Sequence, residues 1–305
     1  MRATGGISVV VPVYNSAGTL DELADRLLGV LRDVATDYEI LFVNDGSEDS
    51  SWATIVDLTQ RHDRVRALDL MRNSGQHNAL LAGIRSARYE LTVTLDDDLQ
   101  NPPEEIPKLL SRLDEGYDVV YGSAEERQFG FWRNVATETT KIALGWVIGD
   151  AIARHVSAFR AFRTSLRDAF ADYDAPYVSI DVLLSWGTTR FSAVEVEHRA
   201  RAEGKSSYSF GRLATHAFNV MTGYSTRPLR IATLIGLVFT LFGILVLGVV
   251  VVTYAVEGGS VPGFPFLASV IAIFSGAQLL TLGIIGEYLA RMHVRVMDRP
   301  PFTIR

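Results

Sequence analysis

Two long stretches near the C-terminal end of the chain contain no charged residue, and they restrict the fold more than any other feature. They span residues 231–256 and 266–286, and the short turn 257–265 separates them. An α-helix rises about 1.5 Å per residue, so about 20 apolar residues are enough to cross the hydrocarbon core of a bilayer. The two stretches therefore predict a hairpin of transmembrane helices. The alternative is a pair of core helices buried in a soluble domain.

The distribution of charge around the two stretches predicts how the hairpin is oriented. The turn carries a single charged residue, Glu257. Five arginines flank the outer ends of the hairpin: Arg227, Arg230, Arg291, Arg295 and Arg299. Flanks rich in arginine stay on the cytoplasmic side of a membrane. We therefore expect a protein of the inner or plasma membrane with two spans, a large cytoplasmic N-terminal part and both termini in the cytoplasm. The apolar run at 7–13 is short and contains proline, so no signal peptide is expected.

The overall composition excludes several classes of function. The net charge of −6 argues against general nucleic-acid binding, because neutralising phosphates requires a basic surface. The chain has no cysteine, which excludes disulfides and thiolate metal sites and fits a reducing compartment.

The N-terminal part alternates between short β-branched runs and segments with helical periodicity. The strand-like runs are 7–13, 38–43, 65–70 and 90–95. The helical segments between them are 19–34, 50–62 and 75–87. Strands that alternate with helices predict an α/β domain, in which a mostly parallel sheet is covered on both faces.

A polar cluster follows each of the four predicted strands: YNSAG, NDGSEDS, RNSGQHN and DDDLQNPP. Ligand sites in such sheets lie beyond the carboxyl ends of the strands, so we predict one site that all four clusters form. The first cluster has a single glycine, which argues against a G-x-G-x-x-G dinucleotide site. Pro12, Tyr14, Asn15 and Asp45 are instead interpreted as a clasp for a base and ribose. In this interpretation Tyr14 stacks on the base, and Asp45 accepts a hydrogen bond from a base N–H.

The fourth cluster begins with three consecutive aspartates. Alternate side chains of an extended segment point the same way, so Asp96 and Asp98 can converge. Asp97 then either reaches the ligand or points into the structure behind. Two converging carboxylates suit Mg²⁺ or Mn²⁺, which also bind substrate phosphates and neutralise the charge that develops on a nucleoside diphosphate leaving group. The NPPE sequence that follows predicts a helix start, with Asn101 as N-cap and Pro102 at the first helical position.

Residues 206–230 precede the first uncharged stretch and carry apolar side chains at helical spacing. This stripe consists of Phe210, Leu213, Ala214, Ala217, Phe218 and Met221. A stripe of this kind often belongs to a protein core. Its position directly before a membrane span predicts an amphipathic helix in the membrane interface.

The motifs, taken together, resemble those of a known enzyme family. VVVPVYN, VNDGS, RNSGQHNALLAGI and LDDDLQNPPE occur in an order and spacing that resemble family 2 glycosyltransferases of the GT-A fold. The two uncharged stretches and the sequence RARAEGKSSYSFGRL are similar to those of polyprenyl-phosphate glycosyltransferases. That group includes dolichol-phosphate mannose synthases and bacterial undecaprenyl-phosphate glucosyl and aminoarabinosyl transferases. The resemblance implies a Rossmann-like GT-A domain at 1–205, an interfacial helix at 206–230, a transmembrane hairpin at 231–290 and a cytoplasmic tail at 291–305.

The resemblance also implies a reaction, which is the inverting transfer of a sugar from a UDP- or GDP-linked donor to a polyprenyl phosphate at the cytoplasmic face. The polyprenyl chain would be of the undecaprenyl, decaprenyl or dolichyl type, and the cofactor Mg²⁺ or Mn²⁺. An ionised phosphate can attack the sugar without a general base, so the site has to position the acceptor and neutralise charge.

The resemblance assigns roles to particular residues. The catalytic residues would be Asp96, Asp98 and Gln100, with Asp96 and Asp98 as metal ligands. The nucleotide-sugar residues would be Pro12, Tyr14, Asn15, Asp45 and Asp97. The acceptor and phosphate would be bound by Arg127, Arg133, Arg201, Lys205, Ser206 and Tyr208. For the basic residues, the alternative is an exposed charge or a contact with a lipid headgroup.

Three other functions remain open at this point. A membrane-anchored glycosyltransferase with a non-lipid acceptor would share the nucleotide motifs. A processive polysaccharide synthase would carry Q-x-x-R-W, whereas no tryptophan of this chain follows an arginine. An inactive scaffold that binds sugar nucleotides would not be expected to keep an intact D-x-D.

Two further features concern the sugar pocket and the oligomer. The stretch HVSAFRAFR at 155–163 lacks the glycine or acidic residue that many relatives carry before the FR pair, which leaves the geometry of the sugar pocket open. Small residues in the spans predict close helix packing and a homo-oligomer. These residues are Gly236, Gly243, Gly276, Gly283 and Gly286.

Overall fold

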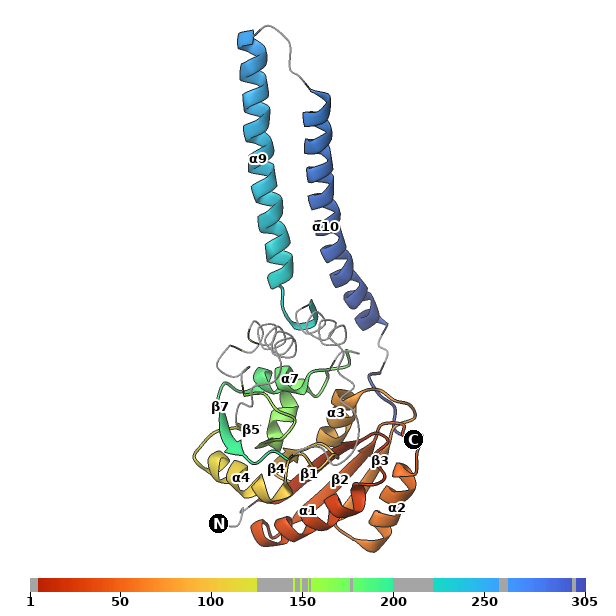
Figure 1. Ribbon diagram of the computed structural model, residues 1–305. Coiled ribbons are helices and arrows are strands. Elements are labelled where there is room, and N and C mark those ends of the chain that lie inside the picture. The colour runs from red at the N-terminus through yellow and green to blue at the C-terminus, as the bar shows by residue number, and fades with distance from the viewer. Residues whose placement is uncertain are drawn as a thin grey trace. The chain divides into compact units, whose positions relative to one another are not determined.

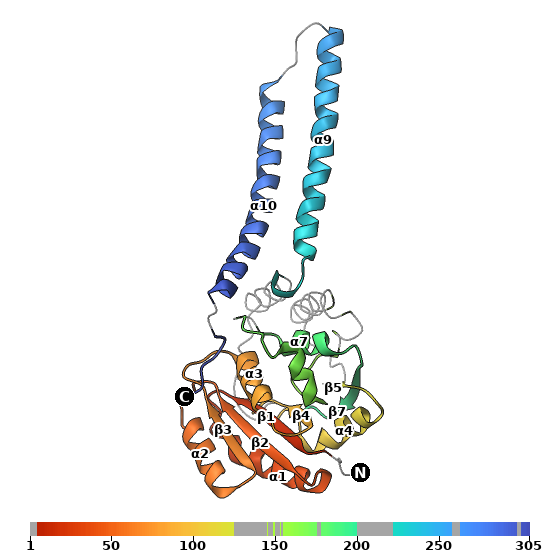
Figure 2. The same ribbon diagram turned by 180° about the vertical axis from the view of Figure 1, so that it is seen from behind.

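The computed structural model of the chain consists of two compact units (Figures 1 and 2). One unit, the head, comprises Met1–Ala217 with Asp298–Arg305, and the other, the hairpin unit, comprises Phe218–Met297. The residues that the structure describes are 5–124, Gly145, Gly149, Ala153, 155–175, 178–199, 222–257, 263–297 and 300–305.

The described strands of the head form one sheet in the order β3-β2-β1-β4-β6-β5-β7. The first four strands pair in parallel, with β3 at one edge. Strand β6 runs antiparallel between β4 and β5, and β7 is parallel to β5. The prediction of an α/β head with a mostly parallel sheet is therefore confirmed. The strands are β1 Ile7–Val13, β2 Tyr38–Asn44, β3 Val65–Asp69, β4 Leu91–Thr94, β5 Val119–Ala124, β6 Arg160–Arg163 and β7 Phe191–Val196.

The antiparallel strand β6 brings distant parts of the sequence together at the end of the sheet where β4 terminates. Arg160, the first residue of β6, pairs with Thr94, the last residue of β4. Next to them, the Gly122 N–H in β5 donates a hydrogen bond to the carbonyl of Phe159 at 2.8 Å. The chain therefore leaves β5 and enters β6 at the same end of the sheet as the carboxyl ends of β1, β2 and β4.

Helices cover both faces of the sheet. Alternate residues of β1 pack in one hydrophobic core with buried residues of α1, α2 and α4. Helix α3 packs on the other face, where Gly83 lies so close to β1 that an added Cβ would come within 2.3 Å of Val10 Cγ1. The helices of the head are α1 Leu20–Val34, α2 Ser51–Arg61, α3 Gln76–Ser86, α4 Ile106–Asp114 and α7 Ile180–Gly187, with 3-10 turns at Pro103–Glu105 and Thr164–Phe170.

Helix α1 illustrates why these elements form. Leu20, Leu23, Leu27 and Leu31 recur at helical spacing and are fully buried, as the periodicity predicts. Each buried leucine contributes about 1.5–3 kcal/mol relative to an exposed one. Asp21 and Glu22 in the first turn and Arg32 in the last turn add a favourable interaction with the helix dipole.

The start of α4 differs from the prediction. The α-helix begins at Ile106 after a 3-10 turn at Pro103–Glu105, and no side chain caps it. Pro102 is extended, with ψ 128°, because the ring of a following proline disfavours helical backbone. The predicted N-cap, Asn101, instead lies with its Oδ1 3.3 Å from His198 Nδ1.

The hairpin unit consists of two long helices, α9 Arg227–Glu257 and α10 Phe264–Val296. By length and composition, both are able to cross a membrane. Phe274 of α10 packs edge-on against Phe239, with the ring centres 5.7 Å apart, and beside Gly243, where an added Cβ would meet its ring at 2.9 Å. Helix α10 continues ten residues beyond the predicted span end at Gly286. Most of the predicted interfacial helix lies outside the described residues.

Candidate active site

Four loops at the carboxyl ends of β1, β2, β3 and β4 form the candidate site. The strands are adjacent and parallel, so their ends lie at the same edge of the sheet. Hydrogen bonds between side chains and backbone then join these loops to one another. The four polar clusters of the sequence are therefore parts of one structure.

Asn15 joins the β1 loop to the β2 loop. Its N–H donates to Ser47 Oγ at 3.1 Å, and its Oδ1 accepts a hydrogen bond from the Glu48 N–H at 2.8 Å. The backbone of Asn15 is in the left-handed region, with φ 55°, which asparagine tolerates better than most residues. Beside it, Tyr14 exposes 46% of its surface, so its ring is accessible to a ligand.

Asp45 fixes the loop between β3 and α3. Its two carboxylate oxygens accept hydrogen bonds from the Ser74 N–H at 2.7 Å and the Gly75 N–H at 2.9 Å. Burial raises the pKa of Asp45, and these two hydrogen bonds partly offset that rise. Gly46, with φ 68°, is packed so closely that an added Cβ would be 2.6 Å from the Asn73 nitrogen. A base N–H would have to share the Asp45 oxygens with this loop.

The three consecutive aspartates have three different partners. Asp96 Oδ1 accepts a hydrogen bond from Gln76 Nε2 at 2.6 Å, at the start of α3. Asp98 accepts two from Gln100, one from the backbone N–H at 3.1 Å and one from Nε2 at 2.6 Å. Asp97 accepts one from the Tyr14 N–H at 3.3 Å, so its side chain is directed to the β1 loop.

The surroundings of Asp97 shift the pKa of its carboxyl group. Burial raises its pKa, hydrogen bonds from Ser16 and Tyr14 lower it, and the charge of Asp98 raises it again. The backbone around Asp97 is also fixed, because Thr19 Oγ1 donates to the Asp97 carbonyl at 2.7 Å. The aspartates are therefore held against the β1 loop by both side-chain and backbone contacts.

Backbone strain occurs in the loop with the aspartates. In the part of the chain that the structure describes, Asn15 and Leu99 are the non-glycine residues with positive φ, at 55° and 59°. A leucine in this region costs on the order of 1 kcal/mol. Leu99 lies between Asp98 and Gln100, and its conformation bends the chain so that Gln100 can turn back to Asp98. Strain of this kind is concentrated at functional sites.

A buried ion pair lies beside Thr94, the last residue of β4, and helps to hold it in place. Arg160 Nη1 contacts Asp181 Oδ1, and both side chains are almost fully buried. Arg160 Nε also donates to Thr94 Oγ1 at 3.1 Å, two residues before Asp96. Tyr121 donates its hydroxyl proton to Asp181 at 3.0 Å, and burial followed by the Asp181 charge raises the pKa of Tyr121 well above its usual value.

The donor set at the aspartates fits a magnesium or manganese ion. Asp96 and Asp98 offer hard carboxylate oxygens, and such ions take one or two carboxylates together with substrate phosphates and water. No group of three or more acidic, histidine or cysteine side chains that could hold a metal occurs among the described residues. A closed site made entirely of protein ligands is therefore not found in that part of the chain.

The structure describes only some of the residues that the sequence predicts to form the site. It brings Tyr14, Asn15, Asp45 and the three aspartates to one edge of the sheet, and Pro12 lies in β1 two residues before Tyr14. The predicted acceptor residues all lie outside the described residues: Arg127, Arg133, Arg201, Lys205, Ser206 and Tyr208.

Gln76 is one of two site residues to which the sequence motifs assign no role. Gln76 lies in the RNSGQHN cluster, at the start of a predicted helix. An amide side chain at this position, in a cluster expected to lie near the carboxylate pair, is the signal that could have indicated its contact with Asp96. Arg199 is a second such residue, because its N–H donates to the Gln100 carbonyl at 2.8 Å.

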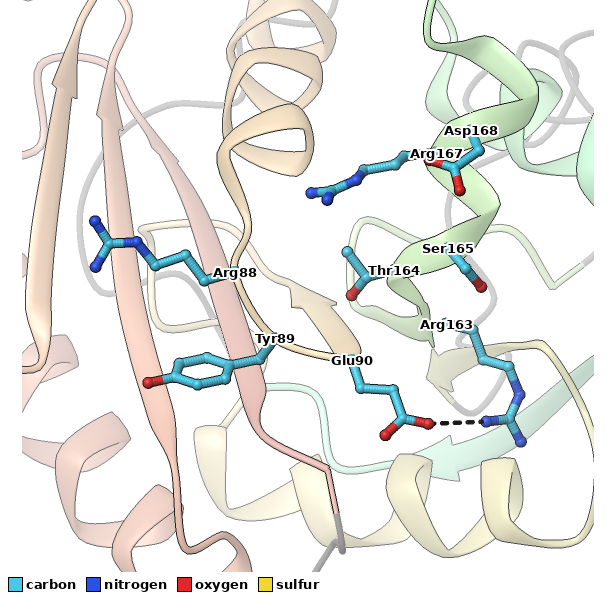
Figure 3. Close-up of a pocket in the computed structure, with 8 residues that line it drawn as sticks. All are labelled: Arg88, Tyr89, Glu90, Arg163, Thr164, Ser165, Arg167 and Asp168. Atoms are coloured by element: carbon cyan, nitrogen blue, oxygen red, sulfur yellow. Dashed lines mark ion pairs between the residues drawn. The ribbon is translucent and has the colours of Figure 1, made fainter.

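A polar pocket of about 300 Å³ lies elsewhere in the head (Figure 3). It is formed where β4 begins and β6 ends, which is the opposite end of these strands from the aspartates. Glu90 and Arg163 form an ion pair across it at 3.9 Å. Arg167 donates to the Ala87 carbonyl at the end of α3 at 2.6 Å, so this cation has a structural partner. The pocket does not belong to the candidate site.

The chain belongs to glycosyl transferase family 2, whose sequence model matches residues 8–173. The chain is similar to the undecaprenyl-phosphate 4-deoxy-4-formamido-L-arabinose transferase of Proteus mirabilis (strain HI4320). The two are 33% identical over 302 residues, and the match covers 98% of this chain and 93% of the relative.

The fold is also similar to that of solved structures. The crystal structure of glucosyl-3-phosphoglycerate synthase from Mycobacterium tuberculosis with Mn²⁺, UDP and glucosyl-3-phosphoglycerate matches with a TM-score of 0.54 and 16% identity, over 72% of this chain and 78% of that one. The same enzyme with Mn²⁺, UDP-glucose and phosphoglyceric acid matches with a TM-score of 0.53 and 16% identity, over 72% and 78% of the chains. At this identity the likeness shows the fold alone, and that fold is the GT-A type.

Proposed function

We propose that this protein transfers a sugar from a nucleotide-linked donor to a polyprenyl phosphate of the undecaprenyl type and gives a polyprenyl-phosphate sugar with inverted configuration. The observation that carries this proposal is the extent of the match to the Proteus mirabilis transferase. It covers 98% of the chain, and therefore both the head and the two long apolar helices. A lipid acceptor explains why a nucleotide-binding head is joined to such helices.

The donor nucleotide is proposed to bind in the loops after β1 and β2. The exposed ring of Tyr14 supports this role, because an accessible aromatic face can stack on a base. Asn15 holds this loop against the turn at Ser47, so the two loops are fixed relative to each other before the ligand arrives. Asp45 holds a third loop, that of Ser74 and Gly75, in place. Its remaining lone pairs are proposed to accept from a base N–H.

The diphosphate is proposed to lie at Asp96 and Asp98, which would hold Mg²⁺ or Mn²⁺ together with the phosphate oxygens. When bound, such an ion neutralises the charge that develops on the leaving diphosphate. Gln76 and Gln100 orient the two carboxylates through hydrogen bonds of 2.6 Å each. The chain therefore supplies two carboxylates whose directions are set before the donor binds.

The acceptor phosphate needs no general base, because it is already ionised at neutral pH. One of its oxygens forms a bond to C1 of the sugar while the bond from C1 to the diphosphate breaks, and the bonding electron pair leaves with the diphosphate. The basic residues Arg127, Arg133, Arg201 and Lys205, with Ser206 and Tyr208, are proposed to neutralise and orient the acceptor. Arg201 follows Arg199 by two residues, and the Arg199 N–H donates to Gln100.

The proposed function also has consequences for the membrane location and the oligomeric state of the protein. We expect the two spans to anchor the head at the cytoplasmic face, with the arginine-rich flanks on that side. Among the described residues, an added Cβ would meet nothing within 4 Å at Gly236, Gly276, Gly283 or Gly286, so these positions offer a close approach to a second copy. Multi-angle light scattering in detergent tests the expected homo-oligomer, and a monomer at working concentration would contradict it.

The experiment that tests the proposed function uses the purified full chain in vesicles that contain undecaprenyl phosphate. A panel of UDP- and GDP-linked sugars is supplied with Mn²⁺, with Mg²⁺ or with EDTA, and lipid products are identified by mass spectrometry. We expect a lipid-linked sugar from at least one donor and none with EDTA. Absence of a lipid-linked product from every donor would overturn the proposed acceptor. Product formation in EDTA would overturn the metal requirement.

A further inference from the structure

A short segment of the chain that follows α10 pairs with the sheet of the head. Residues 300–305 lie along the end of β3, where Leu70 and Ile304 form an antiparallel bridge. The Met71 N–H donates to the Thr303 carbonyl at 2.9 Å, and the Arg305 N–H donates to the Asp69 carbonyl at 2.8 Å. Strand β3 is at the edge of the sheet, and Figure 1 shows the end of the chain beside it. This segment, which we call the return strand, therefore pairs with the last carbonyl of β3, at Asp69, and with the Met71 N–H just after the strand, groups that an edge strand would otherwise leave unpaired.

Side chains of the return strand reinforce the pairing. Pro301 is buried, and the Arg85 guanidinium of α3 lies over the Phe302 ring at 5.9 Å. Arg305 Nη1 lies 2.9 Å from Asp69 Oδ2. The segment is therefore fixed to the head at both of its ends.

The contact between Arg305 and Asp69 involves a buried carboxylate. Its side chain is buried, with 7% exposed, and its Oδ1 accepts a hydrogen bond from Asn44 Nδ2 at 2.8 Å. Its Oδ2 accepts no hydrogen bond of good geometry from the residues that the structure describes, so the nearby Arg305 charge compensates this oxygen. A buried carboxylate oxygen that loses its compensating charge is unfavourable, and its surroundings must adjust.

The contacts continue from Asp69 into the loops that are proposed to bind the donor nucleotide. Asn44 is the last residue of β2, and its Oδ1 accepts a hydrogen bond from the Ser47 N–H at 3.2 Å, across the turn that contains Asp45. On the other side, Met71 is the first residue of the loop whose far end, Ser74 and Gly75, is held by Asp45. The return strand thus holds the near end of this loop directly and the β2 turn through two side chains.

We propose that the return strand is a positioning element for the donor nucleotide, and that Arg305 is a positioning residue that acts through Asp69 and Asn44. The inference rests on the proposed function for the identity of the ligand, and on the contacts above for its mechanism. No described contact joins Arg305 to Asp96, Asp97 or Asp98. Arg305 is also distant in the sequence from the predicted acceptor residues. Its loss should weaken nucleotide binding and leave the chemical step unchanged.

The test compares Arg305→Gln with Arg61→Gln in the full chain. Arg61 pairs with Asp21 and Asp57 on the surface of α1 and α2, so it is a matched arginine outside the donor loops. Calorimetry measures the binding of UDP and of GDP in the presence of Mn²⁺, and turnover assays give KM for the donor and kcat. We expect Arg305→Gln to raise Kd and KM by about three- to five-fold, the size of a lost partly exposed ion pair, with kcat unchanged. Arg61→Gln should change none of the three.

Two further measurements separate this inference from the proposed function. Hydrogen exchange of the backbone amides at 44–47 and 71–75 needs no donor, and it should become faster in Arg305→Gln but not in Arg61→Gln. Asp69→Asn combined with Arg305→Gln should restore slow exchange, because the neutral amide no longer needs a compensating cation. Unchanged exchange and unchanged nucleotide affinity in Arg305→Gln would overturn the inference, whichever sugar or acceptor the enzyme uses. Faster exchange in a chain without transferase activity would overturn the proposed function alone.

Discussion

Gln76 Nε2 donates a hydrogen bond to Asp96 Oδ1 at 2.6 Å and thereby joins the start of α3 to the first of the three aspartates. Helix α3 packs on the sheet through Gly83 and the loop before it is held by Asp45, so Gln76 is a fixed donor. A carboxylate that is oriented in this way needs less rearrangement when it binds a cation.

Replacing Gln76 by Ala should therefore weaken the metal more than the nucleotide. We expect the Mn²⁺ concentration for half-maximal activity to rise by about ten-fold or more, the usual effect of losing a group that orients a ligand. A titration of activity with Mn²⁺ at saturating donor measures this shift. Gln60→Ala, on the exposed side of α2, is the matched control and should behave as the wild type. An unshifted titration in Gln76→Ala would show that Gln76 does not orient a metal ligand.

Asp98→Asn should remove most of the activity without unfolding the head. The amide keeps the size of the carboxylate but loses its charge, and we expect kcat to fall on the order of 100-fold or more. Thermal unfolding should stay close to that of the wild type, because the amide oxygen of the replacement can still accept a hydrogen bond from the Gln100 N–H. Activity comparable to the wild type would show that Asp98 is not a metal ligand.

Asp97 predicts a dependence of stability on pH. Burial is the largest cause that raises its pKa in the folded protein, so the folded state binds this proton more tightly than the unfolded state. The favourable contribution is therefore complete below the ordinary aspartate pKa of about 4, and it is lost as pH rises through the raised value.

Asp97→Asn removes this titration. The melting temperature of the variant minus that of the wild type should increase as pH is raised from about 4 to 7, the range above the ordinary pKa. Thermal unfolding in detergent over this range measures the difference. Asp25→Asn, at an exposed position of α1, serves as the control for the loss of a surface carboxylate. A difference that falls with pH for Asp97→Asn would contradict the environment described for this residue.

The buried pair of Arg160 and Asp181 predicts a strongly non-additive pair of variants. Arg160→Met leaves the Asp181 charge buried without its cation, which costs about 3–5 kcal/mol of unfolding free energy. Arg160→Met combined with Asp181→Leu removes both charges and should recover part of that loss, although the buried Tyr121 hydroxyl then loses its acceptor. Denaturant unfolding followed by tryptophan fluorescence measures both. Equal destabilisation by the single and the double variant would show that packing, not charge, dominates at this position.

Much of the head could be predicted from the sequence because its signals are local. The run of Ile7–Val13 is a continuous apolar strand, and the leucines of α1 recur on one face, so both elements follow from periodicity alone. The alternation of side chains also predicts that Asp97 points away from Asp96 and Asp98, and in the structure each of the three carboxylates has its own hydrogen-bond partner.

Other features depend on contacts between distant residues, which periodicity does not contain. The two oxygens of Asp45 are occupied by backbone amides about 30 positions away, so its role in shaping a loop was not visible beside its predicted role at a base. The helix start after the aspartates was mispredicted, because the effect of two consecutive prolines on the first turn exceeded the capping preference of Asn101. The return strand has too few residues for a strand pattern, and its partner is β3, more than 200 positions earlier.

The reversed strand β6 has a consequence for how such an enzyme can diversify. The chain departs from β5 and comes back to β6 at the edge that carries the aspartates, and the Gly122–Phe159 hydrogen bond closes this excursion. We therefore expect that the length of the connection between β5 and β6 can differ among related enzymes without disturbing the pairing of the other strands or the loops that follow β1, β2 and β4.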